Sequence, residues 1–122
     1  ATPTLLKLGG KAVEGVTLVG DFAPDGATDA AKAFIAAYTK RFGSAPDNFA
    51  AVGYAQVQVL GAVLDKLGPK PTREAVRDAF ASSVTNIPTV LGTGPYTITP
   101  KREVQYMPVL LRVTNGQFVG VK

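Results

Sequence analysis

The sequence predicts an α/β fold for this chain of 122 residues. Three observations indicate it: an apolar, β-branched run near the start, three stretches with apolar side chains at helical spacing, and alternating apolar side chains near the end. Apolar residues make up 46% of the chain and charged residues 18%, which is typical of a globular domain rather than a disordered segment. No apolar run approaches the roughly 20 residues of a membrane-spanning helix.

The first predicted element is a strand over residues 16–22, which lies between Gly15 and Pro24. Its nearly continuous apolar character is typical of a strand that is buried on both faces, as in a parallel sheet. Asp21 and Phe22 fall at the carboxyl end of this strand, and ligands of open α/β sheets bind beyond such ends. The residues alone leave two alternatives open: the pair borders a cleft, or it is a strand end followed by a core phenylalanine.

Three helices are predicted in the middle of the chain. Each follows a side chain that can cap a helix N-terminus: Thr28 for residues 29–42, Asp47 or Asn48 for residues 49–67, and Thr72 for residues 73–82. The second helix is apolar almost all round, so we expect it to be buried on more than one side. Phe49 opens this helix. It is either a core contact at the helix start or an exposed aromatic wall that covers an apolar group of a ligand.

The end of the chain changes to the period of a strand. A short strand is expected over residues 94–99, and apolar side chains alternate over residues 107–113. Asn115-Gly116 predicts a tight hairpin turn, because a type I′ turn requires positive φ at both central residues. The return strand is expected over residues 118–121.

Composition excludes several classes of function. The chain has no cysteine and no histidine, which removes thiol nucleophiles, disulfides, thiolate metal sites and imidazole chemistry. The carboxylates fall mostly at helix starts and on polar helix faces, so we expect no enzyme activity, no metal and no cofactor. The glycine turn at residues 92–94 precedes a strand rather than a helix, unlike a phosphate-binding loop. The net charge of +4 is scattered along the chain, so we expect no nucleic-acid binding.

Several motifs in order carry a resemblance to a known family. They are Ala12-Val13-Glu14-Gly15-Val16, Asp21-Phe22-Ala23-Pro24, Tyr38-x-x-Arg41-Phe42-Gly43 with Pro46-Asp47, Phe49-Ala50-Ala51-Val52-Gly53-Tyr54, the segment 72–80, Gly94-Pro95-Tyr96-Thr97-Ile98 and Asn115-Gly116-Gln117-Phe118-Val119. Together they resemble the C-terminal portion of type I periplasmic solute-binding proteins of ABC transporters, the Leu/Ile/Val-binding family. The loop at residues 99–103 departs from the pattern, because the family usually has an Asp/Gly-rich turn there.

The resemblance implies an incomplete two-lobe α/β fold with Rossmann-like lobes. Residues 1–20 and 107–122 would belong to one lobe and residues 23–105 to the other, with crossovers near residues 20–22 and 105–107. Phe49 matches a position that lines the ligand pocket of the family, and Asp21 and Phe22 lie at the crossover beside it. The family's main polar ligand contacts lie mostly upstream of this chain.

The resemblance also implies a function. The chain would be part of a periplasmic, non-enzymatic component of an ABC importer, binding an amino acid or a small organic or aromatic acid and engaging the membrane subunits of the transporter. Two alternatives remain: a ligand-sensing module of a receptor or regulator on the same fold, or an interaction fragment that binds no solute. We expect apolar surface on the second helix and the first strand to be covered by an N-terminal portion of the protein, or by a second copy through strand exchange.

Overall fold

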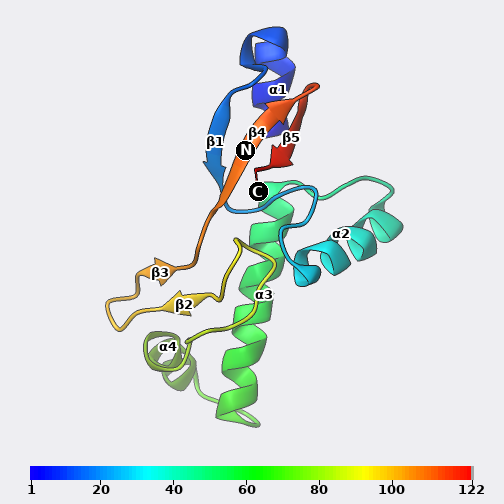
Figure 1. Ribbon diagram of the computed structural model, residues 1–122. Coiled ribbons are helices and arrows are strands. Elements are labelled where there is room, and N and C mark those ends of the chain that lie inside the picture. Colours follow the sequence, from blue (N-terminus) through cyan, green and yellow to red (C-terminus); the bar gives the residue numbers. More distant parts are fainter. Residues whose placement is uncertain (122) are drawn as a thin grey trace.

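The computed structural model describes residues 1–121 and has the expected α/β character. Its elements are α1 (Pro3–Gly9), the 3₁₀ turn η1 (Gly10–Val13), β1 (Thr17–Gly20), α2 (Asp29–Phe42), α3 (Asn48–Leu67), α4 (Arg73–Ser82), β2 (Thr97–Ile98), β3 (Val104–Gln105), β4 (Val109–Thr114) and β5 (Gln117–Gly120). Figure 1 shows α1 beside the sheet of β1, β4 and β5, while the other helices and the β2–β3 pair form the rest of the molecule. Two segments connect these parts, one after β1 and one before β4.

The three central helices begin at the predicted capping side chains. The hydroxyls of Thr28 and Thr72 each accept a hydrogen bond from a backbone N–H in the first turn that follows, at 3.2 and 3.1 Å. At α3, Asp47 is the cap, because its Oδ1 accepts a hydrogen bond from the Ala50 N–H at 2.8 Å. The Asn48 side chain is therefore available for contacts outside the helix. Within residues 1–121, none of the helices has the length and apolar character needed to cross a membrane.

The larger sheet is antiparallel, with β4 in its centre and the order β1-β4-β5. The expectation that the first strand is buried on both faces of a parallel sheet is wrong. β1 pairs antiparallel with β4, and Val19 is 67% exposed. Side chains alternate between the two faces of a strand, and only one face of this sheet is covered within the described residues. Leu111 is accordingly buried while its neighbour Leu110 is exposed.

The hairpin between β4 and β5 has the predicted turn, with φ of 52° at Asn115 and 71° at Gly116. The strand expected over residues 94–99 is limited to Thr97–Ile98, and it pairs with β3. The sequence pattern predicts neither β3 nor α1. α1 has only seven residues, about two helical turns, which is too short for the helical period to be recognised in the sequence.

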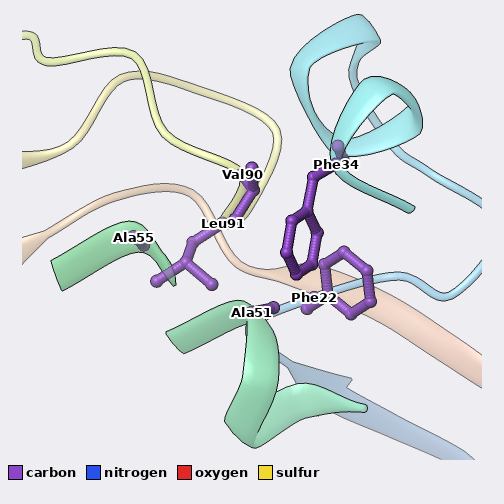
Figure 2. Packing of buried hydrophobic residues seen from close by; sticks show 7 residues of the cluster. Phe22, Phe34, Ala51, Ala55, Val90 and Leu91 are labelled. Carbon is purple, nitrogen blue, oxygen red and sulfur yellow. The ribbon is translucent and has the colours of Figure 1, made fainter. Parts of the chain in front are cut away.

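The main core joins β1's end to the helices (Figure 2). Phe22 is 1% exposed, and its ring meets the ring of Phe34 in α2 edge to face, with centroids 5.9 Å apart. Ala31 of α2, Ala51 and Ala55 of α3 and the segment 90–91 complete this cluster. A second cluster packs the far half of α3 against α4, and it contains Val59, Val63, Ala79 and Val84.

Helix α3 is covered on one face only, contrary to the expectation of burial on more than one side. The buried residues are Ala51, Ala55, Val59 and Val63. An exposed stripe at helical spacing lies on another face, and we call it the α3 stripe: Phe49, Val57, Leu60 and Leu64. The described residues therefore leave a long apolar helix surface in contact with solvent.

Candidate ligand-binding site

Asp21 connects three segments that are distant in the sequence. It follows β1 directly, and its Oδ1 accepts a hydrogen bond from the Tyr106 hydroxyl at 2.5 Å. Its Oδ2 accepts a hydrogen bond from Asn48 Nδ2, in the first turn of α3, at 3.1 Å. The carboxylate thus ties the chain after β1 to the chain before β4 and to the start of α3.

The electrostatics of this group follow from the same contacts. The hydrogen bond from Tyr106, and next the one from Asn48, lower the pKa of the Asp21 carboxyl. Burial, and next the hydrogen bond to the Asp21 carboxylate, raise the pKa of the Tyr106 hydroxyl. At neutral pH, Asp21 is therefore an anion and Tyr106 a neutral donor. Asn48 Oδ1 is buried without a hydrogen-bond partner among the described residues.

Backbone hydrogen bonds fix the same two segments to a third turn of the chain. The Gly92 N–H donates to the Asp21 carbonyl at 2.8 Å, and the Thr93 N–H donates to the Met107 carbonyl at 2.9 Å. Gly92 has a φ of 64°, and a Cβ at this position would lie 2.1 Å from the Met107 carbonyl oxygen. Only glycine fits this close approach of two backbone segments.

A cavity of about 410 Å³ opens beside Asp21. Its lining combines apolar and polar side chains: Asp21, Val52, Ala55, Gln56, Leu91, Tyr96, Val104 and Tyr106. The rings of Tyr96 and Tyr106 are stacked there, with centroids 5.7 Å apart. Few polar groups in a mostly apolar hollow of this size are typical of small-molecule sites. The described residues hold no cluster of three or more acidic side chains that could bind a metal ion.

Of the three predicted site residues, Asp21 lines the cavity. Phe49 follows Asn48 in the chain and is 69% exposed, so it is not a core contact in the described residues. Phe49 is not among the residues that line the cavity. Phe22 lies in the core against Phe34, which favours the core alternative for this residue.

Sequence reasoning missed Asn48, Gln56, Tyr96 and Tyr106 as members of the site. A signal existed for Asn48, because it stands next to a second capping side chain and only one of the two can cap α3. Tyr106 carries no comparable signal. Its contact with Asp21 spans 85 residues and depends on the pairing of β1 with β4.

Comparisons with known proteins agree with the motifs. A family profile described as "Periplasmic binding protein" matches residues 1–116. A solved structure from Rhodospirillum rubrum, provisionally assigned as a branched-chain amino acid ABC transporter, is 34% identical over 99% of this chain, with a TM-score of 0.79. The leucine-binding protein LivK from Thermotoga maritima is 25% identical over 99% of this chain, with a TM-score of 0.82.

A third structure, an extracellular ligand-binding receptor from Rhodopseudomonas palustris, is 28% identical over 100% of this chain, with a TM-score of 0.79. The chain spans only 34%, 34% and 38% of these three proteins. A comparison with curated protein sequences finds no match. The family profile covers nearly the whole chain, and the fold matches about a third of a type I periplasmic binding protein. The chain therefore belongs to the periplasmic binding protein family, a family of non-enzymatic binding proteins that act in the periplasm or outside the cell.

Proposed function

We propose that this chain is the C-terminal third of the solute-binding component of an ABC importer. The whole protein binds an amino acid or a small organic or aromatic acid between two lobes and presents it to the membrane subunits of the transporter. One observation carries the proposal: the match to the family over residues 1–116 includes both segments that meet at Asp21. Closure of the lobes is the mechanism, because a solute that contacts both lobes favours the closed state.

The proposed lobes divide the chain at these two segments. Residues 1–20 and 107–122 belong to one lobe and residues 23–105 to the other, with crossovers near residues 20–22 and 105–107. The arrangement in Figure 1, where the sheet with α1 and the helical part are joined by two connecting segments, supports this division. Phe49 covers an apolar group of the solute, and Asp21 and Phe22 form the crossover beside it. Among these solute classes, the likeness to the leucine-binding protein LivK supports an amino acid.

The rest of the protein covers the apolar surface that this chain exposes. The α3 stripe beyond Phe49, which is Val57, Leu60 and Leu64, and the open face of the larger sheet, with Val19 and Leu110, are exposed within the described residues. Single exposed apolar residues are normal, but several of them on one helix face, next to an open sheet face, indicate an interface. The chain spans about a third of its relatives' length, which leaves two thirds of each relative to supply the covering elements. A second copy of the chain through strand exchange is the alternative cover.

A ligand-sensing module is the second candidate function. The similarity to the extracellular ligand-binding receptor favours it. Both functions use the same site and the same closure, and they differ in what the closed state contacts: transporter subunits or a signalling partner. A non-binding interaction fragment is the remaining alternative.

The test is a thermal-shift screen on the full-length protein that contains this chain. The panel consists of the twenty amino acids, benzoate, hydroxybenzoates and short aliphatic acids. We expect at least one member to raise the Tm, because a solute that binds only the folded state stabilises it. If no member of the panel raises the Tm and calorimetry also detects no binding, the proposal fails in favour of the non-binding alternative.

A further inference from the structure

Both oxygens of the Asp21 carboxylate are already engaged within the chain, although Asp21 lines the cavity beside the proposed solute. Each carboxylate oxygen already accepts a hydrogen bond from within the chain, one from Tyr106 and one from Asn48. A carboxylate that grips a cationic group of a solute directs its oxygens at that group. The contacts of Asp21 point instead to the segment before β4 and to the start of α3.

The hydrogen bond from Asn48 to Asp21 fixes the backbone next to Phe49, the proposed aromatic wall. Asn48 is the first residue of α3, and Phe49 follows it. Asp47 supplies the cap of this helix, so the Asn48 side chain is not needed for capping and instead anchors the helix start to Asp21. The stacked ring of Tyr96 holds Tyr106 from the other side. The position of Phe49 relative to both crossovers is thus fixed through a chain of side-chain contacts.

We infer that Asp21 is a positioning residue: it acts on solute binding through Asn48 and Tyr106, and it needs a hydrogen bond to each of them but not its charge. The inference rests on the proposed function for its effect on affinity. Its effect on the start of α3 stands independently of any solute.

The variant Asp21→Asn distinguishes a positioning role from a direct contact between the carboxylate charge and the solute. In Asp21→Asn, the new amide oxygen accepts the hydrogen bond from Tyr106. The new NH₂ group at position 21 donates a hydrogen bond to Asn48 Oδ1 once the Asn48 amide rotates by half a turn. In the wild type, Asn48 Oδ1 has no hydrogen-bond partner among the described residues. In Asp21→Ala, the Asn48 NH₂ and the Tyr106 hydroxyl both lose their acceptor, which is costly for partly buried groups.

The experiment measures two properties of the full-length protein. Hydrogen exchange of the ligand-free protein reports on the amides of residues 50–53, and calorimetry measures the affinity for the solute found by the panel. Asp21→Ala is expected to speed exchange in this turn roughly tenfold and to weaken affinity roughly ten- to hundredfold. Asp21→Asn stays within a fewfold of wild type in both.

The matched control is Val63→Ala. Val63 is buried in the second cluster, fifteen residues and about 22 Å along α3 from Asn48. This variant lowers the Tm through a cavity, so it shows what general destabilisation does to affinity and to exchange at residues 50–53. We expect it to leave both unchanged.

Each result decides one claim. The inference is overturned if Asp21→Asn loses as much affinity as Asp21→Ala while its hydrogen exchange stays at the wild-type rate. That result means that the charge of Asp21 contacts the solute. Unchanged exchange in Asp21→Ala overturns it as well, whether or not a solute binds. If wild type binds no solute but Asp21→Ala speeds exchange while Asp21→Asn and Val63→Ala do not, the positioning role stands and the proposed function fails.

Discussion

At the scale of single residues, two exposed phenylalanines provide a matched comparison. Phe49 is 69% exposed at the start of α3, and Phe42 is 59% exposed at the end of α2. Phe42 packs on Tyr38, with ring centroids 4.5 Å apart, and lies under the Arg41 guanidinium. Phe42 therefore has partners within its own helix, whereas the proposed partner of Phe49 is the solute.

We predict that Phe49→Ala weakens solute affinity of the full-length protein roughly tenfold or more, because a buried aromatic ring contributes strongly to a binding interface. Phe42→Ala is expected to leave affinity unchanged. Isothermal titration of both variants makes the comparison. Equal affinity in wild type and Phe49→Ala would remove this residue from the site.

The carboxyl group of Asp21 also predicts a dependence of stability on pH. Its pKa is lowered in the folded state, first by the hydrogen bond from Tyr106 and then by that from Asn48. The ionised group therefore stabilises the fold above about pH 4, near the pKa of an unfolded aspartate, and this stabilisation is lost as pH falls through the lower folded pKa.

Below pH 4, we expect the Tm of the wild type to fall more steeply with decreasing pH than the Tm of Asp21→Asn. Thermal melts of the full-length protein from pH 7 to pH 3 measure this. A Tm difference that is constant over the whole range contradicts the assigned pKa direction.

At the scale of elements, local capping chemistry was predictable and long-range pairing was not. Thr28, Asp47 and Thr72 cap the helices that the sequence predicts, because a cap depends on residues within one turn. The Asn115-Gly116 turn is equally local. By contrast, an apolar run such as residues 16–22 does not reveal whether its neighbour is parallel or antiparallel, and here the neighbour is β4.

Two glycines in different surroundings, Gly92 in a turn and Gly61 in α3, test the described packing of the elements. Gly92 has a positive φ and approaches the Met107 carbonyl, whereas a Cβ at Gly61 in α3 would meet nothing within 4 Å. Gly92→Ala is expected to destabilise the full-length protein by more than about 1 kcal/mol, since strain and a backbone clash add. Gly61→Ala is expected to stabilise it by up to about 1 kcal/mol, because alanine is the better helix former. Denaturant unfolding compares the two, and a neutral Gly92→Ala would contradict the described close approach.

At the scale of the whole molecule, the candidate site was only half predictable. Asp21 could be recognised from a strand end and the family motifs, whereas Phe49 stays a prediction, because it does not line the cavity. Tyr106 and Asn48 could not, because their roles arise only where β1 and β4 bring distant segments together. The buried position of Phe22 likewise depends on where α2 packs.

The exposed apolar surface predicts how the isolated chain behaves. Val57 in the α3 stripe is 67% exposed, and the stripe continues through Leu60 and Leu64. We expect residues 1–122 alone to self-associate at micromolar concentrations, and Val57→Lys to reduce the association, since a charge opposes burial of the stripe. Sedimentation velocity makes the measurement, with Ala36→Lys on the exposed side of α2 as the control. A stable, monodisperse wild-type monomer would contradict this expectation.

The central claim is that the whole protein closes on a small solute between two lobes, and small-angle X-ray scattering of the full-length protein tests it most directly. The solute is the member of the panel that raises the Tm most. We predict that saturating solute decreases the radius of gyration, and that Phe49→Ala requires a higher solute concentration for the same decrease. A bound solute that leaves the radius of gyration unchanged would contradict closure, and with it the two-lobe account of this chain.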